Sequence, residues 1–231
     1  ENVESKIVDI NEYKEDEALL DLTYYDRKTV EHWGKEILTN KDIDAHIDGL
    51  DDVITKPHAF TQLLHDSIRR KFDYDISCVH LPTSGETGLS GQITNEALYN
   101  AYPHPDVPID LTLKGQQIKE ILEYCYAHIE FSGGSLSLTI VDETLCTFWQ
   151  GVDYTIDMNA LPFERVQLNN ITLDHMYRVS MTDYCYRNYK QYLEQAVIHE
   201  TGEITMVELI SRNLKDDQYK IKQKQTFEVL I

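Results

Sequence analysis

The stretch from residue 107 to residue 129 constrains the fold most, because two kinds of periodicity meet in it. Residues 107–113, VPIDLTL, form a largely apolar run of strand length. Directly after it, apolar side chains recur at helical spacing within and just beyond residues 114–128: Ile118, Ile121, Leu122, Cys125 and Ile129. A helix with one apolar stripe has to bury that stripe, so we expect a sheet with this helix packed against it.

Strand-like and helix-like segments alternate irregularly along the rest of the chain. Periodicity and start signals predict helices over residues 15–33, 57–72, 95–102 and 208–216. Strands are predicted over residues 75–81, 135–141, 147–157, 165–173, 176–184 and 226–231. This mixture favours an α+β fold with a mixed sheet flanked by helices, and not a doubly wound fold.

Composition indicates an acidic globular chain. Its 231 residues suffice to bury a sizeable core in one domain, with or without an appendage. The net charge of −19 argues against a nucleic acid partner, which needs clustered Lys and Arg. No apolar run reaches the ~18 residues of a membrane span. The four cysteines lack metal-type spacing, and three of them have the apolar or aromatic surroundings typical of core residues. Without an initiator Met before Glu1, we read the sequence as a fragment and predict no compartment.

Motifs of self-contained catalysis are absent from the sequence. It contains no G-x-x-x-x-G-K-[ST], G-x-G-x-x-G, H-E-x-x-H or G-x-S-x-G pattern. Its nine histidines form no dense cluster with acidic residues at metal-ligand spacing. We therefore predict no catalytic residue, no metal site and no cofactor in this chain.

Two short stretches have the composition of a ligand site. In AYPHPD, residues 101–106, two prolines hold His104 on a stiff corner, although a solvated turn explains the same residues. In MTDYCYRNYKQY, residues 181–192, four tyrosines and two cations follow an apolar strand. Such a segment is typical of a stacking platform for planar rings and also of an ordinary core edge. The residues alone leave both pairs of interpretations open.

Taken in order, residues 57–192 resemble the C-terminal domain of the 5′-nucleotidase family, which includes UDP-sugar hydrolases and cyclic-nucleotide phosphodiesterases. Residues 91–123 match the family pattern G-x-I-T-x-x-x-L…P-F-x-N…V-x-L-x-G-x-x-L-K-x-x-L-E without a gap, apart from the departures given below. FWQGVDYTID, residues 148–157, and ITLDHMYRVSMTDY, residues 171–184, resemble two later family segments. Residues 57–77 stand where members have a helix of the L-G-N-L-x-x-D-A type.

The resemblance implies a domain that grips the nucleoside part of a nucleotide. It also implies an N-terminal metallophosphoesterase domain, which binds two divalent metal ions and hydrolyses the phosphate ester. The signature pair of that domain, Asp-x-His together with Asn-His-Glu/Asp, is missing from the sequence. Residues 1–55 would then comprise the tail of the preceding domain and an acidic linker over residues 39–55. Residues 56–231 would form the substrate-binding domain.

Three substrate-site residues follow from the resemblance in the two short stretches. The first stacking Phe of the family falls on His104, the Asn two places later falls on Asp106, and the second stacking Phe falls on Tyr184. A His/Tyr pair can still sandwich a planar ring. We expect the two rings on opposite walls of one cleft. Asp106 should lie at its rim and favour bases that carry an exocyclic amine.

Two further substrate-site residues follow from family loops that this sequence alters. The Asn and Arg of an Asn-Gly-Gly-Gly-Ile-Arg loop fall on His80 and Gly85, and the acid of a Gly-Gly-Asp segment falls on Lys190. Gly85 and Lys190 therefore complete the implied site. Because the Arg is lost, an ordinary nucleoside monophosphate is not the only substrate to consider.

Three functions remain open at this stage. We favour the substrate-binding domain of a two-domain hydrolase of phosphoric monoesters. The second is a binding module whose nucleotide site has decayed or been re-aimed at another small ligand. The third is a structural or partner-docking domain.

Overall fold

A five-stranded mixed sheet forms the centre of the fold. The computed structural model describes residues 11, 13–81, 87–132, 135–138 and 146–231. The sheet has the order β11-β4-β10-β2-β7, in which β10 runs parallel to β2 and the other pairs are antiparallel. Its strands are β11 (Val197–Thr201), β4 (Pro108–Lys114), β10 (Met176–Thr182), β2 (Ile76–His80) and β7 (Thr147–Gln150). The predicted α+β class with a mixed sheet is thereby confirmed.

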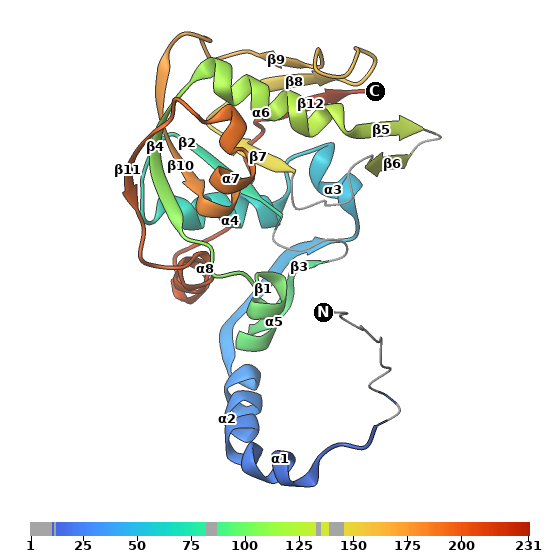
Figure 1. Ribbon diagram of the computed structural model, residues 1–231, viewed down its shortest axis with the longest axis vertical. Helices are drawn as coiled ribbons and strands as arrows, with labels where there is room; N and C mark the ends of the chain where they lie inside the picture. Colours follow the sequence, from blue (N-terminus) through green and yellow to red (C-terminus); the bar gives the residue numbers. More distant parts are fainter. Residues whose placement is uncertain (1–10, 12, 82–86, 133–134, 139–145) are drawn as a thin grey trace, which may run out of the picture.

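Amphipathic helices flank this sheet. Helix α4 (Ala59–Arg69) packs against β2 and against α8 (Met206–Lys215), whereas α6 (Gly115–Ala127) packs against β4, β7 and the short strand β9 (Val166–Leu168) (Figure 1). The stripe predicted from the sequence is confirmed, since Ile118, Ile121 and Leu122 of α6 are fully buried. Thr205 opens α8 with a capping box, in which its hydroxyl accepts from the Glu208 N–H.

A smaller three-stranded sheet follows, and the sequence predicted part of it wrongly. Residues 147–157, expected as one strand, form β7 and then β8 (Tyr154–Asp157), which belongs to the sheet β12-β8-β9 with β12 (Phe227–Leu230). Gly151 separates the two strands with a φ of 81°, which glycine adopts without steric cost. A Cβ there would lie 2.1 Å from the Asp75 carbonyl oxygen, so the chain turns where no side chain fits.

The segment from 39 to 55, expected as a weakly patterned linker, consists largely of regular secondary structure. Most of it belongs to β1 (Ile37–Ile47), which pairs antiparallel with β3 (Thr87–Thr94), and α3 (Leu50–Ile54) follows. Ile43, Ala45 and Ile47 are buried, while the alternate residues face outward. The acidic residues thus occupy the solvent side of a half-buried strand. Because of their charge, the alternation of apolar and polar side chains along this strand was not recognised in the sequence. The division of the chain at residues 55 and 56 stays a prediction.

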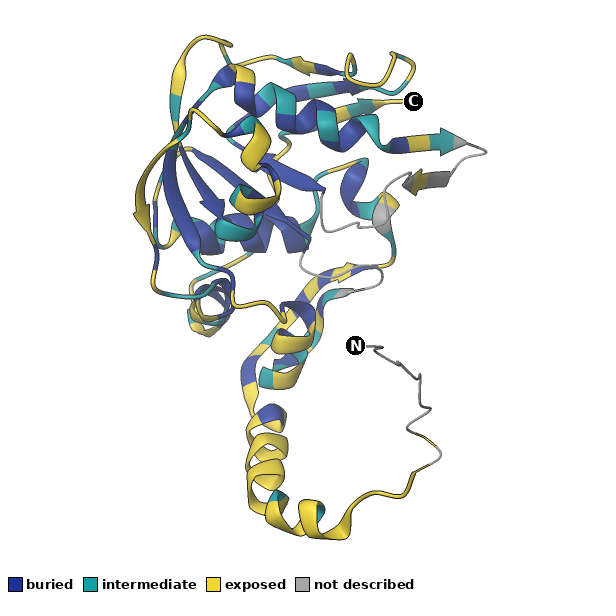
Figure 2. Cartoon of the chain, in the orientation of Figure 1, coloured by how far each residue is buried: buried dark blue, intermediate teal, exposed yellow. Residues whose placement is uncertain are grey.

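The first helical segment extends away from the rest of the fold. Residues 15–33 do not form one helix but α1 (Glu17–Leu22) and α2 (Tyr24–Lys35), with Thr23 between them and Gly34 inside α2. Most of both helices is exposed (Figure 2), including the large apolar side chains of Leu19 and Val30. Trp33 reaches α5 (Asn95–Ala101), where its ring lies 5.0 Å from that of Tyr99. Among the described residues, no helix has both the length and the apolar character needed to cross a membrane.

Two more predicted strands differ in extent from the observed ones. The strand expected over residues 176–184 ends at Thr182, because Thr182 caps the helix α7 (Asp183–Asn188) by accepting from the Cys185 N–H. Of the strand expected over 135–141, residues 135–138 form β6, which pairs with β5 (Ile129–Ser132). Residues 139–141 lie outside the described residues.

A buried carboxylate ties β4 to β10. The guanidinium of Arg178 donates to both oxygens of Asp110, and the Tyr74 hydroxyl donates to Oδ2 at 3.0 Å. The hydrogen bonds from Arg178 hold the pKa of Asp110 below its ordinary value. The ionised form is therefore the one that the fold stabilises.

We expect Asp110→Asn to lower the urea midpoint at pH 7 and to have less effect below about pH 4. A carboxyl group whose pKa is depressed by folding contributes its full stability above its unfolded pKa of ~3.9 and loses it as the pH falls through the folded value. Urea unfolding of the wild type and the variant at pH 7 and pH 3 measures both differences. An equal difference in midpoint between the two proteins at both pH values would contradict the conclusion that the fold stabilises ionised Asp110.

Candidate functional site

The candidate site lies where three strand ends meet. Strands β2 and β10 are parallel, so their last residues, His80 and Thr182, lie at the same edge of the sheet. Strand β4 runs the other way, and its first residue, Pro108, is paired opposite Thr182. The corner that precedes β4 and the helix α7 that follows β10 are thereby brought to this edge (Figure 1).

Backbone hydrogen bonds fasten the corner to the first turn of α7. The Val107 N–H donates to Asp183 Oδ1 at 2.9 Å, and the Asp183 N–H donates to the Val107 carbonyl oxygen at 2.9 Å. On the other side, the Met206 N–H donates to the Asp106 carbonyl oxygen at 2.7 Å. The proline-rich corner is thus attached to α7 and to the start of α8.

Three aromatic rings line up at this edge. The imidazole of His80 stacks on the phenol ring of Tyr184, with centroids 4.3 Å apart and planes inclined by 22°. The imidazole of His104 lies 6.5 Å from the same phenol ring, with planes inclined by 16°. His80 is buried, Tyr184 half-buried and His104 exposed, so the rings run from the interior to the surface. The structure therefore brings together the two residues predicted to stack on a ligand.

Asp106 does not lie at a rim, contrary to the sequence-based expectation. Its side chain is buried, at 3% exposure, and Oδ2 accepts from the Tyr102 hydroxyl at 3.1 Å. His80 Nε2 lies 3.4 Å from the same oxygen, and Arg187 Nη2 lies 3.9 Å from Oδ1. A buried carboxylate needs such partners to offset its desolvation. Because these contacts occupy it, the expected preference for amine-bearing bases loses its basis.

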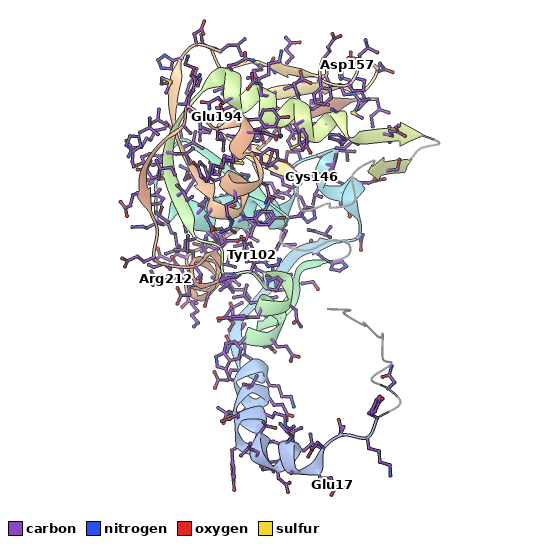
Figure 3. All side chains as sticks on the ribbon, viewed as in Figure 1. Glu17, Tyr102, Cys146, Asp157, Glu194 and Arg212 are labelled. Atoms are coloured by element: carbon purple, nitrogen blue, oxygen red, sulfur yellow. The ribbon has the colours of Figure 1, made fainter. Side chains whose placement is uncertain are left out.

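Of the two remaining predicted residues, Lys190 does not join the rings. Lys190 is exposed in a 3₁₀ turn after α7 (η3, Lys190–Tyr192) and lines a separate cavity of about 450 Å³ with Tyr186 and Glu194. Figure 3 labels Glu194 near this turn. Gly85 lies outside the described residues.

Sequence reasoning missed three contributors to the site. His80 was noted only as an altered family position, and Tyr102 and Arg187 were not singled out. Tyr102, labelled in Figure 3 beside α5, is buried, and this burial raises the pKa of its hydroxyl. Arg187 pairs with Asp183 one helical turn away, and its side chain remains 62% exposed. The i, i+4 spacing of these two charges was the available signal.

At the buried end of the row of rings, a thiol, the imidazole of His80 and a carboxylate lie one after another. Cys185 Sγ is 3.7 Å from His80 Nδ1, and His80 Nε2 is 3.4 Å from Asp106 Oδ2. Burial opposes ionisation of Cys185, but a hydrogen bond with the Cys78 thiol and the nearby His80 imidazole lower its pKa. This order of groups occurs in nucleophilic catalysis. However, all three residues are buried, so a substrate has no access to the thiol, and we assign the set a structural role.

A larger cavity, of about 550 Å³, lies elsewhere, between β1, the end of α8 and residues 217–223. None of the residues predicted for the site lines it. Lys41, on its wall, donates to the carbonyl oxygens of Leu214 and Tyr219 at 3.3 and 3.4 Å, and so helps to cap α8. Its ammonium group is therefore already engaged within the protein.

Across the described part of the chain, no group of three or more His, Cys, Asp or Glu residues could hold a metal ion. The tripeptide Asp44-Ala45-His46 does spell Asp-x-His. It lies on β1, where His46 Nε2 is 3.4 Å from the exposed Asp48 carboxylate. The side chains therefore fit no metal ion in this region.

Comparisons with known proteins place the chain beside one family. Residues 45–195 match the family described as 5′-nucleotidase, C-terminal domain. No curated protein matches the chain.

Solved structures share the fold. A Staphylococcus aureus protein described as a 5′-nucleotidase, crystallised with α-ketoglutarate, superposes with a TM-score of 0.80 at 22% identity, over 96% of this chain and 45% of that one. A 5′-nucleotidase precursor of Thermus thermophilus gives 0.68 at 17% identity, over 93% and 42%. The Haemophilus influenzae NAD nucleotidase gives 0.62 at 13%, over 93% and 42%. This chain thus spans less than half the length of each of these proteins.

We expect Asp183→Ala to lower the free energy of unfolding by about 1.5–3 kcal/mol, the usual range for a lost hydrogen bond to a charged group. The variant leaves the Val107 N–H without its side-chain acceptor and removes the ion pair between Asp183 and Arg187. Asp183→Asn is the matched control, because it retains an acceptor oxygen and should cost less. Urea denaturation measures both, and an equal loss in the two variants would contradict the role of the Val107 bond.

Proposed function

The chain belongs to the family of 5′-nucleotidase C-terminal domains, and from that premise we propose that it binds the nucleoside part of a nucleotide between His104 and Tyr184. One observation carries the proposal: the two rings are nearly parallel, at 16°, with centroids 6.5 Å apart at the protein surface. Two nearly parallel rings at this separation are suited to a flat aromatic ligand.

The spacing of the rings supports insertion of a single base. An aromatic ring stacks on each neighbour at about 3.5 Å, so a sandwiched base needs roughly 7 Å between the outer rings. The centroids lie 6.5 Å apart, and the exposed side chain of His104 can move to set the spacing of the ring planes. Stacking of this kind contributes ~1–3 kcal/mol per base and tolerates different bases.

In this proposal the chain binds and orients, and another part of the parent protein performs the hydrolysis. The two divalent metal ions of the family would belong to an N-terminal metallophosphoesterase domain, with which residues 1–55 would connect and residues 56–231 would cooperate. Metal-assisted hydrolysis needs ligands that fix the ion and lower the pKa of its water. The described residues offer no such cluster, and the chain spans only 45% and 42% of two structures described as 5′-nucleotidases.

A second function has one observation in its favour, the distribution of charge. The family Arg falls on Gly85, and Arg187, a cation beside the rings, already pairs with Asp183. An uncharged nucleoside, or another uncharged heteroaromatic ligand, does not need a further cation beside the rings. A binding module re-aimed at such a ligand is therefore the alternative to a nucleotide-binding domain.

We expect the 231-residue chain to bind adenosine and AMP, and His104→Ala and Tyr184→Ala to weaken each affinity at least fivefold. Loss of one stacking partner removes ~1–3 kcal/mol. Phe163→Ala is the matched control, because Phe163 is an exposed aromatic whose ring contacts His128. Calorimetric titration measures all four proteins. Binding of adenosine but not AMP would favour the re-aimed module, and absence of binding of either ligand by the wild type would refute the nucleotide-binding proposal.

We expect no release of phosphate from AMP by the chain alone, with or without added Mn²⁺ or Zn²⁺. No described cluster can fix a metal ion and its attacking water. A colorimetric phosphate assay over a series of protein concentrations tests this, with a complete two-domain 5′-nucleotidase as the positive control. Phosphate release that rises in proportion to the concentration of this chain would show that the catalytic groups are present here.

A further inference from the structure

The phenol ring of Tyr184 rests on an imidazole that a ligand cannot reach. His80, the last residue of β2, is only 1% exposed. Its ring stacks on Tyr184 with centroids 4.3 Å apart and planes inclined by 22°. A residue so deeply buried acts on a bound molecule only through the side chain that covers it, here Tyr184.

The imidazole of His80 is itself held in place by its polar surroundings. Nδ1 lies within hydrogen-bonding distance of the Thr182 hydroxyl, at 3.2 Å, whereas Nε2 lies 3.4 Å from the Asp106 carboxylate and makes no hydrogen bond within the described residues. The ring of Tyr102 meets it edge-on, with centroids 6.3 Å apart. Because these groups come from β10 and from the corner before β4, the plane of the imidazole is set by the ends of the central sheet.

Tyr184 is the second residue of the six-residue helix α7 and is half-buried. A tyrosine side chain has two torsions, and any rotation about them in the free protein has to stop when a ligand stacks on the ring. A fixed ring against one face of the phenol limits this freedom before the ligand arrives, and such preorganisation raises affinity.

We propose that His80 is a positioning residue, whose ring backs Tyr184 and keeps the phenol parallel to His104. The identity of the bound ligand rests on the proposed function, whereas the effect on Tyr184 does not. It follows that the phenol stacks on His80 within the protein and offers its stacking surface to one ligand ring. A ligand with two bases would bind through one of them.

Two substitutions separate the ring of His80 from its polar groups. His80→Phe retains a flat ring and removes the contacts with Thr182 and Asp106. His80→Gln retains a polar group that can reach Thr182 and removes the ring. If His80 acts by stacking, His80→Phe preserves the orientation of Tyr184 and His80→Gln does not. If His80 has a purely polar, structural role, the reverse is expected.

The first measurement needs no ligand. Two-dimensional NMR of the chain with ¹³C-labelled tyrosine rings resolves the Tyr184 signal, which Tyr184→Phe identifies by its disappearance. We expect the ring current of His80 to shift this signal in the wild type, His80→Phe to keep a ring-current shift, and His80→Gln to move the signal toward that of an exposed tyrosine. An unchanged Tyr184 signal in His80→Gln would overturn the proposal.

The second measurement is the affinity for adenosine by calorimetric titration. We expect His80→Gln to bind at least fivefold more weakly than the wild type, and His80→Phe to bind within twofold of it. Equal affinities of the wild type and His80→Gln, or equal weakening in both variants, would refute the positioning role. If the wild type does not bind adenosine, the proposed function fails, and the NMR comparison still decides whether His80 positions Tyr184. His80→Asn replaces His80→Gln should the latter not fold.

Discussion

The register of β10 against its two neighbours is the constraint on which the site depends. Parallel pairing with β2 and antiparallel pairing with β4 place His80, Pro108 and Thr182 at one edge of the sheet. A slip of one residue would exchange the faces of every side chain on the strand and separate these ends. The buried residues of β10, such as Val179 and Met181, hold the register from the core side, and the Asp110–Arg178 pair holds it from the other. The position of the rings is thus a consequence of how the sheet packs.

Buried carboxylates are the second physical theme of this acidic chain. Asp106 and Asp110 flank the start of β4, and both are almost fully buried. Each accepts a hydrogen bond from a tyrosine and lies near a cation, and Asp106 also lies near His80. Paired in this way, an acid costs less to bury and joins segments that are distant in sequence. At Asp106 the result is a rigid corner and not a ligand-binding carboxylate.

If His104 and Tyr184 correspond to the stacking residues of the family, as proposed, the site differs from the family in residue type and retains an aromatic ring at both positions. His104 and Tyr184 stand where the family resemblance has phenylalanines, and His80 stands where it has an asparagine. Imidazole and phenol rings stack as phenylalanine does and add polar atoms that can form hydrogen bonds. A site can thus keep two rings that stack on a flat ligand while the charged residues around the rings change. Under the proposed function, these charged residues distinguish between ligands more than stacking does.

The sequence by itself determined the α+β class, the buried stripe of α6 and the family, because periodicity and ordered motifs are local properties. It also pointed to His104 and Tyr184, through the family pattern. It misjudged residues 39–55, where charged residues on the outer face hid the strand that contains Ile43 and Ala45. Only the tertiary structure decided that Asp106 turns inward and that His80 lies beneath Tyr184. Both facts depend on which strand ends meet, and pairing between distant strands leaves no periodic signal in either segment.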